Sequence, residues 1–160
     1  MSLRNLWDIM GARPHSIFIT ESFGIDRHHE GNIASPMEEA MPYICNSAGS
    51  FVGQKSGSGQ CVEFVRACTH APPSSVRRQG DKVRGNLSIQ RGTAIATFNA
   101  HGLYANDSTG NHAAIYDSQD SSGVWVYDQW VKQGSVQKRQ ISFRGSGSAS
   151  NDGDAFYVVE

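Results

Sequence analysis

Cys61 is the residue whose type and position most strongly suggest covalent chemistry. It follows a glycine- and serine-rich loop at residues 55–60 and opens an apolar-periodic segment. The positions i, i+3, i+4 and i+7, which form one face of a helix, are occupied by Cys61, Phe64, Val65 and Cys68. In the first helical turn, unpaired backbone N–H groups and the helix dipole stabilise a thiolate. The segment predicts either an activated nucleophile or a buried structural cysteine.

A histidine and an acid could complete such a site across a predicted hairpin. The turn cluster at residues 118–122 separates two strand-like segments. A hairpin centred on Asp120 pairs residues whose numbers sum to about 240. His112 then lies opposite Asp128, and their Cβ atoms stand about 5 Å apart. Asp128 could therefore accept a hydrogen bond from the imidazole and fix its orientation. The other predicted pairs are Ala114 with Val126 and Tyr116 with Val124.

The predicted face of the sheet decides whether these groups converge. Val124 and Val126 share the parity of Asp128, which marks this as the core face and the expected packing surface of the Cys61 helix. A one-residue slip would instead place Gln129 opposite His112, so Gln129 is the alternative orienting residue. His112 or Asp128 alone is more often structural than catalytic. The combination with a helix-start cysteine favours a nucleophile, a base and an orienting acid.

The elements that must position these residues are one helix followed by a run of strands. The helix is predicted to start at Cys61 and to end near residue 70, ahead of Pro72 and Pro73. Strands are predicted over residues 92–98, 111–117, 123–130, 138–144 and 155–159. This order indicates an α+β fold with the helix packed on an antiparallel sheet of about five strands. A solvated basic loop is predicted at Arg77, Arg78, Lys82 and Arg84.

Composition excludes several classes of function. The chain has 160 residues, 38% of them hydrophobic, which is enough for one compact domain with its own core. A formal net charge of −1 gives no electrostatic footprint for nucleic acid or an anionic membrane. No apolar run reaches transmembrane length, so membrane insertion is not expected. The first ten residues lack a signal-peptide core and cleavage site, so export would need another route.

The three cysteines leave the redox state open. Either all are reduced, or two pair and one stays free. The pair that spares Cys61 is Cys45 with Cys68. A zinc site built from the cysteines and His70 is disfavoured, because their spacing lacks the C-x-x-C pairing of structural zinc. The run His28–Glu30 fits an exposed polar loop better than a metal site. We expect no metal and no cofactor.

Several motifs carry a resemblance to a known superfamily. Gly59-Gln60-Cys61-Val62 resembles the CHAP nucleophile motif, and the segment 110–116 resembles the Gly-x-His-Val-Ala strand that carries the base. Asp128 stands where that superfamily has its third polar residue. The chain thus resembles the NlpC/P60 and CHAP superfamily of papain-like cysteine peptidases and amidases. From residue 57 onward, the order Gly-Ser-Gly-Gln-Cys, Gly-Thr-Ala-Ile-Ala-Thr-Phe, Gly-Asn-His-Ala-Ala-Ile-Tyr and Asp-Gln-Trp is similar to that of small peptidoglycan amidases delivered by type VI secretion.

This resemblance implies hydrolysis of an amide bond in the peptide stems or cross-links of peptidoglycan. Cys61 would attack, His112 would act as base and then as acid, and Asp128 would hold His112. The backbone N–H of Cys61 and the Gln60 side chain would stabilise the oxyanion, with Gln129 as further support. The residues expected to contact substrate are Gly59, Asn111 and Trp130.

The resemblance also implies partners and a place of action. It implies an immunity protein that plugs the cleft in the producing cell, and delivery without a signal peptide from that cell's cytoplasm into the periplasm of a target bacterium. Residues 51–160 form the predicted catalytic domain, and residues 1–50 an amino-terminal extension packed on it. Two other functions stay open: an acyltransferase or transglutaminase-like enzyme with the same triad, and an inactive wall-binding module.

Overall fold

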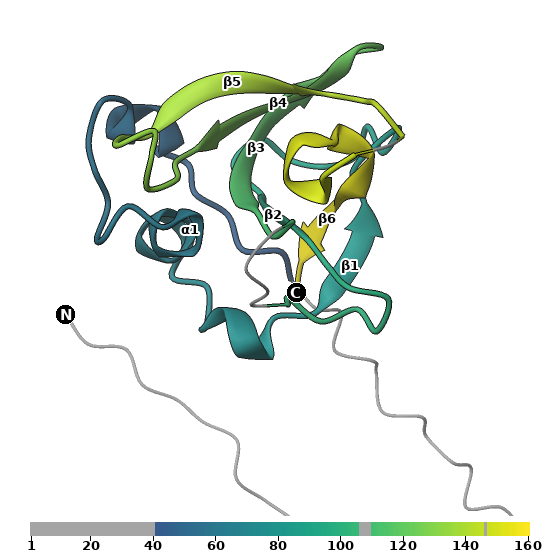
Figure 1. The fold of residues 1–160 in the computed structure, drawn as a ribbon, viewed down its shortest axis with the longest axis horizontal. Coiled ribbons are helices and arrows are strands. Elements are labelled where there is room, and N and C mark those ends of the chain that lie inside the picture. The colour runs from purple at the N-terminus through teal and green to yellow at the C-terminus, as the bar shows by residue number, and fades with distance from the viewer. Residues whose placement is uncertain (1–40, 106–109, 146) are drawn as a thin grey trace, which may run out of the picture. The chain divides into compact units, whose positions relative to one another are not determined.

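The computed structural model describes residues 41–105, 110–145 and 147–160. These residues form one α-helix, α1 (Cys61–Thr69), and a single antiparallel sheet of six strands (Figure 1). The predicted α+β class is confirmed, with six strands in place of about five. The strands are β1 (Gln79–Lys82), β2 (Ala94–Thr97), β3 (Ala113–Gln119), β4 (Gly123–Asp128), β5 (Gln137–Ser142) and β6 (Phe156–Val159). Short 3-10 turns are η1 (Ala48–Phe51), η2 (Ser74–Val76), η3 (Ala149–Asn151) and η4 (Gly153–Ala155).

Helix α1 begins and ends where its sequence predicts. Gln60 has extended backbone angles, and Cys61 is the first helical residue. At the other end His70 adopts the left-handed conformation (φ 59°), and its N–H donates to the carbonyl of Arg66 at 2.9 Å. Such a cap, followed by Pro72, prevents further helical turns. The helix therefore presents its amino terminus at a defined point.

The sheet has the strand order β1-β6-β2-β3-β4-β5. All its pairings are antiparallel, so β6, the last strand in sequence, pairs with both β1 and β2. Val83, which follows β1 at one edge, and Ile141, on β5 at the other edge, belong to the same buried cluster. Two opposite edges share one core only if the sheet curls, and this curled sheet places the start of β3 and the end of β4 beside the start of α1.

The two faces of the sheet have different cores. Helix α1 packs with Phe64 and Val65 against one face, whose strand residues are mostly small or aromatic: Ala94, Ala96, Ala113, Ile115 and Tyr127. The other face, which holds Val124 and Val126, packs against the curled sheet itself. In Figure 1, α1 and the turns η3 and η4 lie on opposite sides of β3. The predicted packing of the helix on the valine face is therefore wrong.

The register of the β3–β4 hairpin also differs from the prediction. Ile115 pairs with Tyr127 and Tyr116 with Val126, whereas Ser118 pairs with Trp125. One extra residue, Asp117, forms a β-bulge, and the hairpin turn lies beyond Asp120. The predicted pairing is off by two residues. Since side chains alternate with a period of two, an even shift keeps His112 and Asp128 on the same face.

One region predicted as a solvated basic loop is partly structured. Its residues 79–82 form edge strand β1, and Arg78, Lys82 and Arg84 are exposed as expected. The prediction is wrong for Arg77, which is 1% exposed and whose Nε donates to the carbonyl of Pro72 at 3.0 Å. A chain reversal after the helix turns this side chain inward, which local polarity does not reveal.

The segment before the helix is tied to the core by a disulfide. Cys45 and Cys68 are bonded, which confirms the pair that leaves Cys61 free. Cys45 and Ala48 are buried in the core under α1, and Ile44 bridges to Thr93. Residues 1–40 of the predicted extension lie outside the described residues, so the boundary at residue 50 stays a prediction. No helix in the described ranges is long and apolar enough to cross a membrane.

Candidate active site

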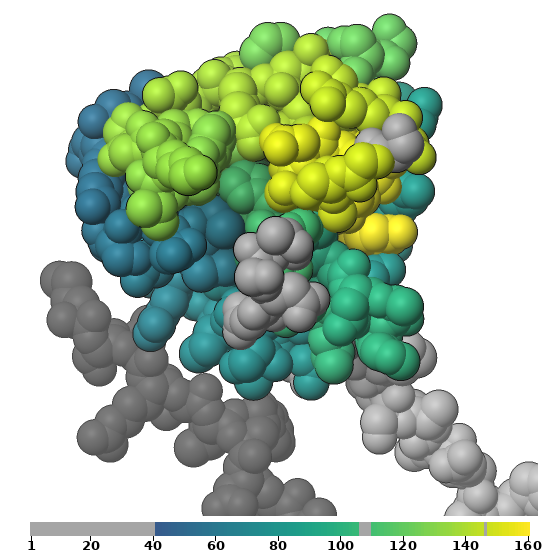
Figure 2. Space-filling view, in the orientation of Figure 1, coloured from purple at the N-terminus to yellow at the C-terminus, as the bar shows by residue number. Residues whose placement is uncertain are grey.

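A cavity of about 840 Å³ opens where α1 and β3 begin and β4 ends. Figure 2 shows it as a hollow between the yellow-green segment after β4 and the yellow segment before β6. Five of the residues singled out in the sequence line this cavity: Gln60, Cys61, Asn111, His112 and Trp130. Asp128 and Gln129 lie behind it and are fully buried. Gly59 is buried and does not line it.

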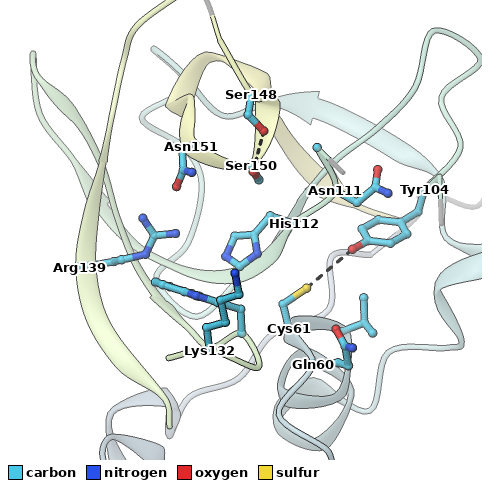
Figure 3. A pocket seen from close by; sticks show the side chains of 13 residues that line it. Gln60, Cys61, Tyr104, Asn111, His112, Lys132, Arg139, Ser148, Ser150 and Asn151 are labelled. Atoms are coloured by element: carbon cyan, nitrogen blue, oxygen red, sulfur yellow. Dashed lines mark hydrogen bonds between the residues drawn. The ribbon is translucent and has the colours of Figure 1, made fainter. Parts of the chain in front are cut away.

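Cys61 occupies the position that activates a thiol. It is the first residue of α1, it is 8% exposed, and its side chain points into the cavity (Figure 3). The preceding loop is held by Glu63, whose Oε2 accepts hydrogen bonds from the N–H and the hydroxyl of Ser58, both at 2.6 Å. Gly57, in that loop, has φ +56°, and a Cβ there would stand 2.6 Å from the Glu63 carboxylate. Glycine is therefore required for the chain to reach Cys61 along this path.

His112 and Asp128 form a short, buried contact. His112 Nε2 lies 2.7 Å from Asp128 Oδ2, with His112 5% exposed and Asp128 fully buried. The backbone of His112 is fixed by Thr97, whose hydroxyl accepts from its N–H at 3.0 Å. Because Asp128 engages Nε2, the other nitrogen, Nδ1, is the one available to the Cys61 thiol. A thiol, an imidazole and a carboxylate thus lie in the order that a catalytic triad would require.

Arg139 is a member of the site that the sequence analysis did not single out. Its Nε and Nη2 approach Asp128 Oδ2 at 2.8 Å and 2.7 Å, and its Cζ lies 4.9 Å from the centre of the Trp130 ring. The carboxylate that holds His112 is therefore itself held by a guanidinium. Strand parity carried the signal, because Arg139 shares a face with the buried Ile141, where an acidic partner stabilises a guanidinium.

Gln129 serves the cysteine loop rather than the histidine. Its side chain is fully buried and points away from Asp128, as strand alternation requires. Its Nε2 donates to the carbonyls of Ser56 at 2.7 Å and Gln60 at 3.0 Å, and its Oε1 accepts from the N–H of Ser56 at 3.0 Å. These three bonds fix the backbone that leads into Cys61. Asp128, the last residue of β4, therefore holds His112 from one face of the sheet. Gln129, the next residue, holds the loop before Cys61 from the other face.

Tyr104 is a second residue of the cavity that sequence pattern does not predict. It is 7% exposed, it lines the cavity, and its hydroxyl oxygen lies 3.8 Å from Cys61 Sγ. Its loop lies between β2 and β3 and has no periodic pattern that would mark an inward side chain. Arg77 is buried nearby, and its positive charge acts on both Tyr104 and Cys61. The Cys61 thiol therefore lies beside the Tyr104 hydroxyl, and the positive charge of the buried Arg77 acts on it.

Electrostatics favour an ion pair between Cys61 and His112. Burial raises the pKa of the Cys61 thiol, but hydrogen bonding and charge from His112, with help from the Ala113 N–H and Tyr104, outweigh it and lower the pKa. Burial alone would lower the pKa of His112, yet Asp128 and Cys61 raise it to about 9. Burial likewise acts to raise the pKa of Asp128, while His112 and then Arg139 hold it below its ordinary value.

No group of three or more histidine, cysteine or carboxylate side chains in the described residues is placed to hold a metal ion. Two of the three cysteines are joined in the disulfide, so Cys45 and Cys68 cannot act as thiolate ligands. The zinc alternative built from these residues is thereby removed.

Comparison with known proteins places this chain in a family. The family model described as domesticated amidase effector 2 matches residues 34–159. The type VI secretion amidase effector 2 protein of Salmonella typhi is 37% identical over 134 residues, which are 75% of this chain and 100% of that protein. Domesticated amidase effector 2 of Ixodes scapularis is 43% identical over 105 residues, 63% of this chain and 70% of that protein. The solved structure of type 6 secretion amidase effector 2 superposes with a TM-score of 0.66 at 35% identity, covering 75% of this chain and 95% of that one. The chain belongs to the domesticated amidase effector 2 family.

Proposed function

We propose that the protein is a cysteine amidase that hydrolyses an amide bond in the peptide stems or cross-links of peptidoglycan. The observation that carries this proposal is the convergence of Cys61, His112 and Asp128 at one cavity, in a chain whose relatives are named amidase effectors. A helix-start cysteine followed by a strand histidine and a third polar residue also supports membership of the NlpC/P60 and CHAP superfamily. The names of the relatives favour neither of the alternatives, acyl transfer or an inactive wall-binding module.

The first half of the reaction forms a thioester. The Cys61 thiolate attacks the carbonyl carbon of the scissile amide, and negative charge develops on the carbonyl oxygen. The backbone N–H of Cys61, at the positive end of α1, and the Gln60 side chain at the cavity wall are placed to stabilise that oxygen. Protonated His112 gives its proton to the nitrogen of the leaving amine, and the carbon–nitrogen bond breaks.

The second half releases the acid product. Water attacks the thioester carbon and passes its proton to the now neutral His112. The carbon–sulfur bond breaks, the product leaves with a new carboxylate, and Cys61 and His112 return to the ion pair. Asp128 keeps the imidazole in one tautomer through both halves, and Arg139 keeps Asp128 ionised.

Substrate would lie along the cavity on both sides of Cys61. Asn111 and Trp130 line it directly and are placed to contact the peptide. Gly59 acts differently from the substrate-contact role predicted for it: its φ of +96° and its buried position shape the loop before the nucleophile.

The biological setting follows from the same proposal. The protein would act as an antibacterial type VI secretion effector, made in the cytoplasm of a producing bacterium and exported into the periplasm of a target cell. An immunity protein that covers the cavity would protect the producer.

The experiment is digestion of purified sacculi by the wild type and by Cys61→Ala, with released muropeptides identified by mass. The wild type should release fragments that carry a new carboxylate, and Cys61→Ala should be at least about a thousandfold slower. A His101→Ala variant, changed at an exposed loop position that does not line the cavity, should match the wild type. Equal release by the wild type and Cys61→Ala, or release by neither, would overturn the proposal. Amine adducts in place of free acids would point to acyl transfer.

A further inference from the structure

The cavity continues past the reacting groups into a second region. Figure 3 shows Arg139 and Asn151 on one side of His112, and Tyr104 and Asn111 on the other. The Arg139 side is completed by Lys132, from the loop after β4, and by Ser148 and Ser150 of the turn before β6. An extended substrate bound at Cys61 would therefore place one of its halves against this region.

Arg139 is held in a fixed orientation, and Asp128 engages only two of its three guanidinium nitrogens. Nε and Nη2 are both engaged by Asp128 Oδ2, and the group stacks on Trp130. Nη1 is the nitrogen that Asp128 does not engage, on a side chain that is 25% exposed and lines the cavity. A guanidinium fixed in this way can donate to a ligand without losing further conformational freedom.

Lys132 is presented by an anchored turn. The N–H of Gln133 donates to the carbonyl of Trp130 at 2.9 Å and closes the turn. The side-chain amide of Gln133 donates to the carbonyls of Asp128 and Ser135, each at 2.9 Å. The backbone of Lys132 is thus attached to the strand that carries the orienting acid. Among the described residues, Lys132 forms no ion pair.

The charges that border the cavity do not cancel. Asp128 and Arg139 form an ion pair, and the lowered pKa of Cys61 beside the raised pKa of His112 favours opposite charges on these two groups. Lys132 adds a positive charge, and no described residue that lines the cavity is acidic. A concave surface with excess positive charge and a fixed guanidinium attracts an anion, and a planar carboxylate fits a guanidinium well.

We propose that the Lys132–Arg139 side of the cavity is a subsite for a free carboxylate of the peptide substrate, adjacent to the scissile amide. The inference rests on the proposed function for the bond that is cut, but not for the binding itself. Peptides whose carboxylate is replaced by a carboxamide would lose the attraction while keeping nearly the same shape. The enzyme would accordingly discriminate between free and amidated forms of one stem peptide.

The test is a binding comparison in the full chain carrying Cys61→Ala, which cannot turn over substrate. Synthetic stem peptides are prepared in pairs that differ only in carboxylate or carboxamide, and calorimetry measures each dissociation constant. The carboxylate form should bind about tenfold more tightly, and the preference should weaken with added salt. Adding Lys132→Met should reduce the preference to about twofold or less. The matched control, Lys82→Met, changes an exposed lysine outside the cavity and should retain it.

Each result decides the proposal separately from the proposed function. Equal binding of the two forms, no binding of either, or an undiminished preference in Lys132→Met would overturn the carboxylate subsite. If sacculi are digested in a Cys61-dependent way but no preference appears, the amidase function stands without this subsite. If the preference depends on Lys132 but sacculi are not digested, the subsite stands and the peptidoglycan amidase does not.

Discussion

His112 and Asp128 meet through a 2.7 Å contact between Nε2 and Oδ2, although their strands do not pair them directly. The ladder that joins Ile115 to Tyr127 continues to Ala114 opposite Asp128. His112 therefore reaches Asp128 diagonally, from just before the first residue of β3. A diagonal contact leaves the end of the sheet open, and the amino terminus of α1 occupies that position with Cys61.

Alkylation of Cys61 should show an abnormal pH dependence. The thiol pKa is lowered chiefly by His112, so iodoacetamide should react with the native protein already near pH 6. His112→Asn should slow the reaction at this pH at least about tenfold, because the stabilising imidazolium is gone. Intact mass should show a single adduct, since Cys45 and Cys68 are bonded. A rate that rises only near the ordinary thiol pKa would contradict the ion pair.

Amidase activity should decline as pH rises through about 9, where His112 loses its proton.

Asp128→Asn should reduce activity at least about a hundredfold and alter stability only in a defined pH range. The folded pKa of Asp128 is depressed, so its ionised form contributes stability that is present above the unfolded pKa of about 4 and is lost as pH falls through the folded value. Urea unfolding of wild type and variant should therefore differ most near neutral pH and converge in acid. A constant difference across this range would show that the charge of Asp128 is not responsible. Glu160→Gln, changed at a half-buried carboxyl that does not line the cavity, is the control.

Gln129→Leu should weaken the fold and the site together. Leucine approximates the shape of glutamine but removes three hydrogen bonds to the backbone of Ser56 and Gln60. Buried groups left without partners should lower the free energy of unfolding by about 2–3 kcal/mol. The Cys61 loop would lose its anchor, so activity should fall even under conditions where the variant is fully folded. Gln137→Leu, at an exposed position of β5, should leave both quantities nearly unchanged. Urea titration and sacculus digestion measure the two effects.

Tyr104→Phe should test the hydroxyl near the nucleophile without disturbing packing. The ring would keep its edge contact with Phe98, whose centroid is 6.4 Å away. Loss of a donor to the thiolate, 3.8 Å from it, should reduce kcat/KM about tenfold and slow the alkylation of Cys61. Tyr157→Phe, outside the cavity, should behave as the wild type. Unchanged kinetics in Tyr104→Phe would restrict this residue to a packing role.

Replacement of both Cys45 and Cys68 by alanine should lower the free energy of unfolding by about 3 kcal/mol, the value expected for a closed loop of this size. The bond joins residues 23 apart and fastens the chain before α1 to the last turn of that helix. A reducing agent should destabilise the wild type by a similar amount and leave the double variant unaffected. Stability of the wild type that does not respond to reduction would contradict the prediction. Urea unfolding with and without reductant measures both effects.

Local pattern was sufficient for the helix, for five of the six strands and for the chemical groups, whereas the sequence predicts a loop where β1 lies. The helix period from Cys61 to Cys68, the glycine loop ahead of it and the alternation in the strands each reflect near-neighbour geometry, so they can be recognised without the fold. For the cysteines, the sequence predicts only that Cys45 with Cys68 is the pair that would leave Cys61 free, and it leaves the reduced state of all three open. The side-chain parity of His112 and Asp128 survived a wrong register because the error was even.

Contacts between residues far apart in the chain decided the strand register, the packing face of α1 and the inward side chains of irregular segments. The bulge at Asp117 set the true register, and the curling of the sheet brought Val83 and Ile141 into one core, which left the opposite face to α1. Tyr104 and Arg77 turn inward from irregular segments that have no period to read. The sequence by itself therefore determined which groups could react. Only the tertiary structure decided that Cys61 reaches them where β3 begins and β4 ends, because that meeting depends on contacts between residues far apart in the chain.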